Sequence, residues 1–506
     1  METKFCAKAN GKLHYPHTIL TGFGFLASSI AWAIYDPYIT KILNFLLNKS
    51  EWVTHMSSKL NETFPRLAEF ASANGENVST AAGGITLVPL FIGIIMTFDN
   101  IFGVIFQPTF GKLSDHTHSR FGKRKPYIIF GAPVSAVLFA IIPVFAIKVG
   151  SLPLTMMFII LFVFIMSLWR APVVALMPDL TPNELRSEGN AIINLMGGIG
   201  GAIGLFAGTI VTVLYCAATG LSTKSENWDE LKTFPYVFLL GSVVIIICTL
   251  VILFFVKEPD SRLKTKAQLN MASEQATAEK AEKAAAKAAR KAQKSEKLPK
   301  AEKKSLIFML MGLFFLFCGT NAVTTFFALF AGEILGKTTA QATIMTTAFA
   351  AASAVAAIPA GQMGKKIGRK KTILSGLLIF IIAFGAYIFT AKAGIDSLSG
   401  ILIWVALVVG GAANMFITVN TLPLVLEIGG IDKVGTFTGY YYTATFSAQI
   451  ATPIVYGIVR MVTGTYMSLF YYCPIAFILS LICILFVKHG EAIPDEIIKQ
   501  IEESND

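Results

Sequence analysis

Three ionisable residues lie inside long apolar stretches of this chain: Asp36, Asp99 and Arg170. An ionised side chain in a lipid-like environment costs several kcal/mol unless it is paired or hydrated, so each is a candidate functional residue. A buried carboxylate can take up and release a proton. We therefore expect Asp99 to be the main proton-coupling residue and Asp36 the second, with Arg170 neutralising Asp99 or binding a solute.

The residues around these two acids have a spacing that suits a polyhydroxylated ligand. Trp32 lies one helical turn before Asp36, and Asn100 and Gln107 share a helix face at i and i+7. An aromatic ring covers the apolar C–H face of a pyranose, while carboxylates and amides hydrogen-bond its hydroxyls. The pattern predicts a sugar site formed by Trp32, Asp36, Asn100 and Gln107.

A structural role is the alternative for the same residues. Asp36 is followed by Pro37, so it could end a kinked helix near water, and Asp99 with Asn100 could tie two helices together. Other polar side chains in apolar stretches have the same two interpretations, solute contact or helix packing. The remaining candidates for solute contact are Arg170, Asn190, Asn194, Asn321, Asn420, Tyr441, Tyr442 and Gln449.

The composition indicates that the bilayer surrounds the elements that carry these residues. Of 506 residues, 54% are hydrophobic and only 14% charged, and a membrane helix needs about 20 mainly apolar residues. Suitable stretches occur at 18–44, 83–108, 127–147, 152–177, 188–216, 233–256, 304–333, 338–360, 372–392, 397–426, 435–459 and 463–487. We therefore expect an all-α membrane protein of twelve transmembrane helices in two six-helix halves.

Basic clusters at 112–125 and 365–371 set the expected topology, because short loops rich in Lys and Arg stay in the cytoplasm. The protein should then be a multi-pass protein of the cell membrane with both termini cytoplasmic. The expected divisions are a cytoplasmic N-terminus (1–17), a first half (18–256) with an external loop (48–82), a cytoplasmic linker rich in Ala, Lys and Glu (257–304), a second half (305–487) and a cytoplasmic tail (488–506).

Charged residues that should control gating are placed at the cytoplasmic helix ends. The candidates are Asp115, Arg120, Arg124, Asp179, Arg186 and Glu427. The segment Gly111 to Lys125 is repeated in outline by Gly361 to Lys371, as expected for two related halves. Such charges can bias a conformational equilibrium as a network, although a single exposed pair contributes only about 0–1 kcal/mol.

The segment GKLSDHTHSRFGKRK resembles the loop signature of the major facilitator superfamily, with His116 where Arg is usual. SRFGKRKP is similar to the glycoside, pentoside and hexuronide cation symporters. FGFLASSIAWAIYDPYI, FDNIFGVIFQPTFGKLSD and RAPVVALMPDLTP are most similar to the branch related to proton-coupled sucrose transporters. Where sodium-coupled melibiose carriers bear aspartates, this chain has Gly103, Gln107 and Arg170, so the resemblance implies protons or no coupling ion rather than sodium.

The resulting hypothesis is a proton-coupled importer of a sugar or glycoside that works by alternating access. An exporter of amphipathic small molecules is the alternative, and a sensor built on a transporter scaffold is a third. No nucleotide-binding, zinc-protease or hydrolase motif is present, so we expect no enzyme, no cofactor and no metal. The net charge of +11 lies in short loops, so we expect no nucleic-acid partner. The expected partners are the solute, protons and lipid, and we expect a monomer.

Overall fold

The computed structural model describes residues 5–8, 12–74, 84–182, 185–223, 225, 228–259, 300–392, 396–429 and 434–488. Within these residues the chain is helical, and the one β-bridge, between Ala7 and Leu13, is isolated. Almost all of the linker expected at 257–304 and of the tail expected at 488–506 lies outside the described residues.

Twelve long helices, in the described part of the chain, confirm the predicted fold class. They are α1 (Tyr15–Lys49), α4 (Val88–Asp115), α5 (Lys125–Pro143) with its π-helical continuation η1 (Val144–Val149), α6 (Leu152–Leu180), α7 (Arg186–Thr219), α8 (Phe234–Phe255), α10 (Lys300–Glu333), α11 (Thr339–Lys366), α12 (Arg369–Lys392), α13 (Asp396–Gly429), α14 (Val434–Thr463) and α15 (Ser468–Leu485).

Eleven of these helices are long and apolar enough to cross a membrane. The remaining one, α14, is long enough but more polar, because it carries several Tyr and Thr residues together with Gln449 and Arg460. It packs closely against α4 and α10 all the same. The helix α14 therefore belongs to the bundle, and its Arg460 is buried in an ion pair with Glu333 of α10 at 2.7 Å, whereas Tyr440 and Tyr442 are exposed.

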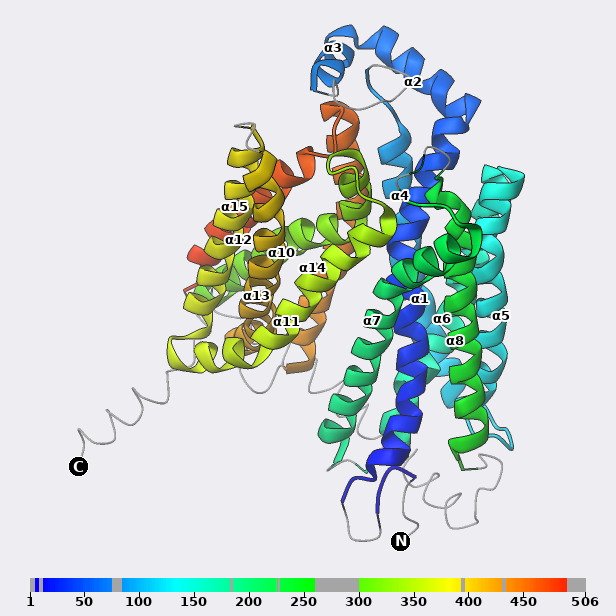
Figure 1. The fold of residues 1–506 in the computed structure, drawn as a ribbon. Coiled ribbons are helices and arrows are strands. Elements are labelled where there is room, and N and C mark those ends of the chain that lie inside the picture. Colours follow the sequence, from blue (N-terminus) through cyan, green and yellow to red (C-terminus); the bar gives the residue numbers. More distant parts are fainter. Residues whose placement is uncertain are drawn as a thin grey trace, which may run out of the picture.

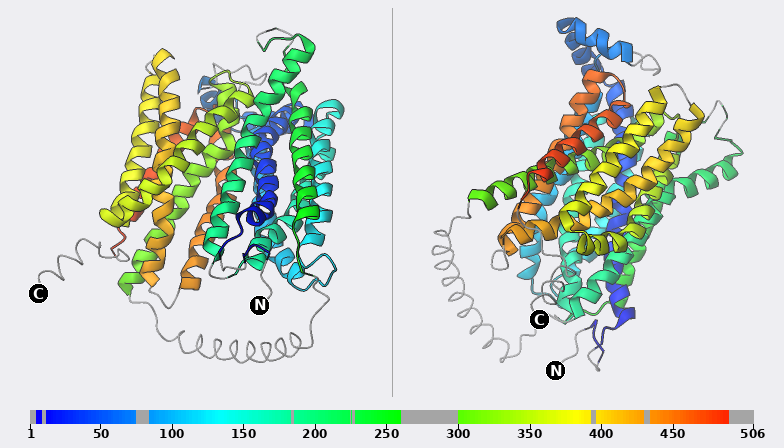
Figure 2. Two further views of the ribbon diagram at one scale, coloured as in Figure 1. Left: turned by 60° about the horizontal axis from the view of Figure 1, so that its bottom comes forward. Right: turned by 90° about the vertical axis from the view of Figure 1, so that its left-hand side faces the viewer.

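The helices form two bundles that lie side by side (Figures 1 and 2). The first half contains α1 and α4 to α8, and the second contains α10 to α15. Glycines let backbones approach within each half: a Cβ on Gly200 of α7 would lie 2.4 Å from the Leu26 carbonyl oxygen of α1. A Cβ on Gly411 of α13 would lie 2.2 Å from the Phe349 carbonyl oxygen of α11.

The stretch expected as an external loop at 48–82 contains two helices, α2 (Glu51–Thr63) and α3 (Pro65–Asn74). They fold back onto the segment before α4. The Asn61 side chain accepts from the Ile85 N–H at 2.8 Å and donates to the Ile85 carbonyl at 3.2 Å, and Ser57 Oγ accepts from the Leu87 N–H at 3.1 Å. These side-chain bonds tie α2 to the segment before α4, and each of the two helices buries an apolar residue, Val53 in α2 and Ala71 in α3.

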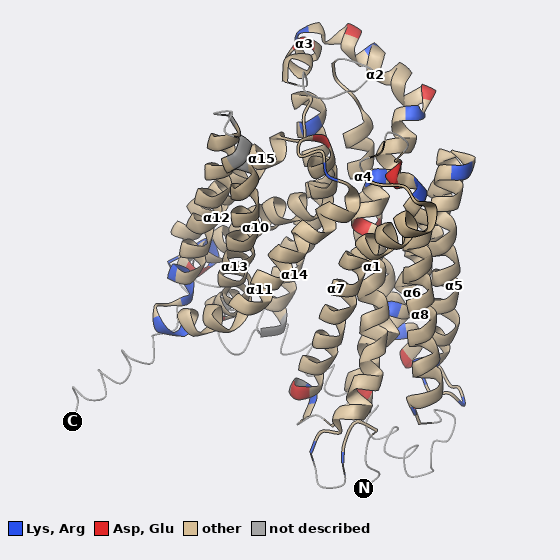
Figure 3. Ribbon diagram, viewed as in Figure 1, with Lys and Arg blue, Asp and Glu red and all other residues tan. Residues whose placement is uncertain are grey.

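The two halves meet at the end of the molecule that bears α2 and α3, which we call the closed face. There α3 touches the end of α14, with Gly464 placed so that a Cβ would lie 2.1 Å from the Ala71 carbonyl oxygen. The opposite end, which carries Arg124 and Arg369, is called the basic face. The helices of the two halves diverge toward it (Figure 1). Charged residues gather toward helix ends and are sparse along the middles (Figure 3).

Candidate functional site

A polar pocket of about 350 Å³ lies between the two halves, midway along the helices. Four helices supply its lining, which is predominantly polar or aromatic. The lining residues are Trp32 and Asp36 of α1, Asp99, Asn100, Gly103 and Gln107 of α4, Ser167 and Arg170 of α6, and Phe446 and Gln449 of α14. All residues of the predicted sugar site and both predicted proton-coupling acids therefore line one pocket, together with Arg170 and Gln449.

The Asp99 carboxylate is held by its own helix. Its Oδ1 accepts from the Asn100 backbone N–H at 2.7 Å and from Asn100 Nδ2 at 3.0 Å. Within the described residues Arg170 forms no ion pair, and its guanidinium lies over the Trp32 ring, 5.6 Å from the centroid. Two carboxylates and one guanidinium thus share the pocket without direct contact, and a bound proton or solute can change their balance.

Trp32 is oriented by an aromatic cluster behind the pocket. Its ring meets Tyr35 edge-on at 5.3 Å and Phe162 at 6.4 Å between centroids, and Tyr35 and Phe162 are both buried. The indole Nε1 is buried and has no hydrogen-bond partner. Buried donors are nearly always paired in native proteins, so this unpaired N–H of a pocket-lining residue is a candidate donor to a ligand.

On its closed-face side the polar pocket is bounded by a tight contact between α4 and α14. Thr97 Oγ1 donates to the Ile450 carbonyl at 3.2 Å. One turn further along, a Cβ on Gly93 would lie 2.0 Å from the Pro453 carbonyl oxygen, and a Cβ on Gly457 would lie 2.7 Å from the Pro89 carbonyl oxygen. The two helices are therefore in backbone contact between the pocket and the closed face.

The other candidates for solute contact are dispersed. Asn194 lines a neighbouring pocket of about 320 Å³ that shares Arg170 with the polar pocket, and Asn190 is exposed one turn away. Asn420 is buried and ties α13 to α11 by donating to the Ala360 carbonyl at 3.1 Å. Tyr442 stacks on Phe446, which lines the polar pocket, and Tyr441 contacts Tyr442, so neither tyrosine lines the pocket itself. Asn321 lines a different cavity, described below.

The gating candidates form ion pairs inside each half. In the first half Arg124 binds both Asp115 and Asp179, the latter at 2.8 Å. In the second half Arg369, which was not among the predicted gating residues, pairs with Glu427. Each arginine follows a glycine of positive φ: Arg124 is two residues after Gly122 (+97°), and Arg369 comes directly after Gly368 (+94°). Glycine adopts such a φ without strain. The sequence repeat between Gly111 to Lys125 and Gly361 to Lys371 could have identified Arg369 as the counterpart of Arg124.

A second pair of equivalent residues fixes the last helix of each half. Lys125 Nζ donates to two carbonyls at the end of α8, at 2.8 and 3.0 Å, and Lys370 Nζ donates to two carbonyls at the end of α15, at 2.6 and 3.1 Å. Glu258 accepts backbone N–H groups at the start of α5, and burial raises the pKa of its carboxyl despite these donors. The basic clusters therefore stabilise helix ends within each half.

Arg120 and Arg186 lie outside these networks. The Arg120 guanidinium lies over the ring of its neighbour Phe121, 4.7 Å from the centroid. Arg186 Nε donates to the Pro178 carbonyl at 3.2 Å. Both contacts are local, so neither residue links helices of different halves in this conformation. No group of three or more His, Cys, Asp or Glu side chains that could hold a metal ion occurs in the part of the chain that the structure describes.

A carboxylate joins the two halves at the closed face. Glu230, in the short helix η3 (Glu230–Thr233) before α8, pairs with Lys41 of α1 at 3.3 Å and accepts from the Thr339 N–H at 2.7 Å. Thr339 is the first residue of α11, in the second half. A helix N-terminus carries partial positive charge, so it favours the carboxylate. Glu230 is thus a latch across the closed face.

Replacing Glu230 by glutamine should open the closed face more often. The loss of one partly exposed ion pair and of a charged group at a helix terminus is worth about 1 kcal/mol, or about fivefold in the conformational equilibrium. Spin labels on each side of the closed face would report this as a larger population of long distances. Glu69→Gln, the same change at an exposed residue of α3, is the control, and identical distance distributions for both variants would refute the latch.

Comparison with known proteins agrees with this architecture. The family model of the Major Facilitator Superfamily matches residues 18–343 and 309–503. Sucrose transport protein SUC3 of Arabidopsis thaliana is 28% identical over 200 residues, 33% of this chain and 31% of that protein. The chain therefore matches about a third of the length of this curated relative.

Solved structures share the fold at low identity. A D-xylose–proton symporter has a TM-score of 0.58 and 15% identity, covering 94% of this chain and 98% of its own. A bacterial homologue of the iron transporter ferroportin, in an inward-facing state, has a TM-score of 0.59 and 10% identity, covering 94% and 98%. Proteins named for solutes as different as xylose and iron share one fold, so the fold does not identify the solute. With its matched family model and its two six-helix halves, the chain belongs to the Major Facilitator Superfamily and is a multi-pass membrane protein.

Proposed function

We propose that this protein is a transporter that moves a sugar or glycoside together with protons by alternating access. The observation that carries the proposal is the composition of the polar pocket. It combines an aromatic ring with a free N–H donor (Trp32), amides (Asn100 and Gln107) and two acids (Asp36 and Asp99). Such a lining offers one face for the C–H surface of a pyranose and several hydrogen-bonding groups for its hydroxyls.

Proton coupling is supported by the charges in the pocket. With Asp36, Asp99 and Arg170 all ionised, the pocket carries one net negative charge, which is unfavourable in the middle of a bilayer. Uptake of one proton removes that charge and lowers the cost of the conformational change that carries the site across the membrane. Asp99 is the proposed proton carrier, with Asp36 second.

The arrangement of the halves supports alternating access. If the basic face is cytoplasmic, as its Lys and Arg residues favour, the structure is an inward-facing state, closed outside by the α4–α14 contact and by Glu230. The proposal then includes both termini in the cytoplasm, a location in the cell membrane and a monomeric unit. Opening of the closed face would expose the same pocket to the other side.

An exporter of amphipathic molecules is the second candidate, because an apolar cavity of about 520 Å³ adjoins the polar pocket. A thermal-shift screen of the detergent-solubilised protein distinguishes the two functions, since specific binding stabilises the native state by RT ln(1+[L]/Kd). Stabilisation by particular sugars, lost on epimerisation or deoxygenation of one hydroxyl, is the expected result. Stabilisation by diverse apolar cations without any effect of sugars would favour the exporter.

Removing the Trp32 ring should weaken sugar binding without unfolding the protein. Burial of a comparable apolar group contributes about 1–3 kcal/mol, so Trp32→Ala should raise the dissociation constant about 5- to 150-fold. Trp32→Phe keeps a stacking ring but lacks the indole N–H, so its loss should be smaller. Trp404→Ala removes an indole that is 42% exposed on α13 and serves as control. Unchanged sugar affinity in Trp32→Ala would contradict the proposed site.

A further inference from the structure

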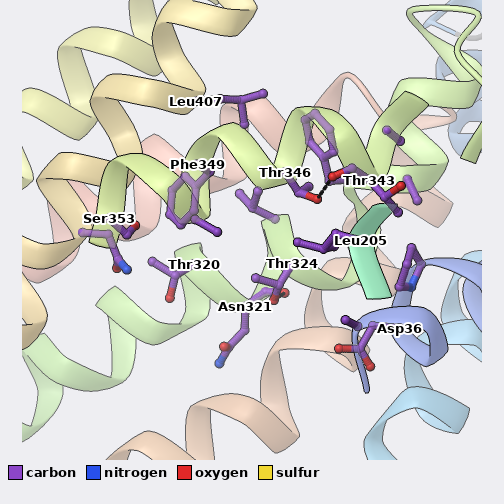
Figure 4. A pocket seen from close by; sticks show the side chains of 18 of the residues that line it. Asp36, Leu205, Thr320, Asn321, Thr324, Thr343, Thr346, Phe349, Ser353 and Leu407 are labelled. Atoms are coloured by element: carbon purple, nitrogen blue, oxygen red, sulfur yellow. Dashed lines mark hydrogen bonds between the residues drawn. The ribbon is translucent and has the colours of Figure 1, made fainter. Parts of the chain in front are cut away.

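A second cavity adjoins the polar pocket on its second-half side, and we call it the aromatic chamber. It has a volume of about 520 Å³ and is lined mainly by α10, α11 and α13, with α1 and α7 of the first half closing one end. Figure 4 shows Asp36 at one end of the chamber and Ser353 at the other. Asp36 lines both cavities, so the chamber and the polar pocket are neighbours that share one carboxylate.

The surface that lines the chamber is mainly apolar. Six phenylalanines contribute to it: Phe317, Phe327, Phe349, Phe380, Phe384 and Phe477. The hydroxyl groups along α10 and α11 are bonded to carbonyls of the protein. Thr324 Oγ1 donates to Asn321 O at 3.0 Å, Thr346 Oγ1 to Thr343 O at 2.9 Å, and Ser353 Oγ to Gly411 O at 2.8 Å. These threonines therefore present mainly methyl groups to the chamber, with their donors already in use.

Two amides, Asn321 and Asn414, line the chamber, and the Asn321 amide has a buried donor without a partner. Asn321 Nδ2 is buried and makes no hydrogen bond, and Figure 4 shows its side chain on α10 on the same side of the chamber as Asp36. An unpaired buried donor is rare in native proteins unless a ligand or water uses it. The chamber thus offers the unpaired Asn321 donor and a second amide, Asn414, within an otherwise mainly apolar lining.

We infer that the transported solute has two chemically different ends. A hydroxyl-rich ring occupies the polar pocket, and an aryl or alkyl substituent of that ring fills the aromatic chamber, with the linking atoms beside Asp36 and Asn321. The solute class is therefore a glycoside with an apolar aglycone rather than a free monosaccharide. A dry apolar cavity of about 150 Å³ already accepts benzene, so the chamber has room for a larger substituent. This inference rests on the proposed sugar transport.

The test is a homologous series of ligands. Methyl glycosides of several sugars are screened first by thermal stabilisation, followed by ethyl, propyl, butyl and phenyl glycosides of the best binder. Burial of each added methylene should tighten binding about fourfold until the chamber is filled. If the methyl glycoside binds but affinity does not rise with substituent length, the chamber does not bind the aglycone, and the proposed sugar site is unaffected.

A variant whose larger side chain fills the chamber provides the matching test on the protein side. Ala350 of α11 lines the chamber, so Ala350→Trp should abolish the gain from longer substituents, and the milder Ala350→Leu should shorten the useful chain by one or two methylenes. Ile382→Trp adds the same ring at a residue of α12 that is 68% exposed and should keep the full series. A gain with chain length that survives Ala350→Trp in folded protein refutes the assignment of the chamber.

The same ligands separate this inference from the proposed function. If no methyl glycoside binds but butyl and phenyl ammonium ions do, and Ala350→Trp abolishes that binding, the sugar site is wrong and an apolar-ligand chamber remains. If neither glycosides nor these cations bind to folded protein, both proposals are overturned.

Discussion

Substitution of Asp99 by asparagine is expected to abolish uphill transport driven by a pH gradient while leaving exchange of bound solute. Asparagine is nearly isosteric, and its Oδ1 can still accept the Asn100 N–H that Asp99 accepts at 2.7 Å, so the fold should persist. It cannot carry a proton. In proteoliposomes each unit of pH gradient can drive about a tenfold accumulation per proton carried, and in the variant the accumulation ratio should fall to one.

Two further variants give this experiment its controls. Glu188→Gln makes the same chemical change at an exposed residue near the start of α7 and should accumulate solute like the parent protein. Asp36→Asn tests the second acid of the pocket. Accumulation that is unchanged in Asp99→Asn but lost in Asp36→Asn would transfer the coupling role to Asp36. Unchanged accumulation in both would mean that neither carboxylate carries the proton.

The parts of the site that depend on local periodicity could be predicted from the sequence. Trp32 and Asp36 lie one turn apart on a helix, and Asn100 and Gln107 share a face, so helical geometry alone places each pair together. The structure brings both pairs into one pocket. The twelve helices were predictable for a similar reason, since the hydrophobic stretches have the length that a bilayer requires.

Contacts between distant segments were not predictable in the same way. Asn420 was expected to reach the solute, but the structure shows its amide bonded to the Ala360 carbonyl of α11, and an isolated polar residue in an apolar helix gives no sign of its direction. Glu230 lies in a connection between helices, outside the apolar pattern, and its role depends on the neighbouring N-terminus of α11. The aromatic chamber needs six phenylalanines from several helices, and only tertiary packing fixes the registers of those helices.

The ion pairs at the basic face depend on conformation as well as sequence. Arg124 and Arg369 each bind carboxylates of their own half, so these networks can hold each half rigid while the halves separate. The contacts between α4 and α14, in contrast, join the halves. An outward-facing state must break the α4–α14 contacts and can retain the ion pairs within each half. Substitutions in the ion pairs within each half should therefore have different effects from substitutions in the α4–α14 contact. The tightest α4–α14 contact, at Gly93, gives the sharper test.

Replacing Gly93 by valine should shift the transporter away from the state described here. A Cβ at this position would lie 2.0 Å from the Pro453 carbonyl oxygen, a separation at which backbone atoms must move apart. Overpacking of this kind costs about 1–3 kcal/mol, equivalent to about 5- to 150-fold in the conformational equilibrium. Because the clash exists only while α4 and α14 are in contact, the cost falls on the state that is closed at this face.

Spin labels at Lys112 and Lys366, at the basic-face ends of α4 and α11, measure the shift once the six native cysteines are replaced. The distance between them should shorten in Gly93→Val as the basic face closes. Gly457→Val should act alike, since its Cβ would lie 2.7 Å from the Pro89 carbonyl oxygen, whereas Gly385→Val, where a Cβ meets nothing within 4 Å, should leave the distances unchanged. Monodisperse Gly93→Val and Gly457→Val proteins with parental distances would show that the α4–α14 contact does not control the closed face.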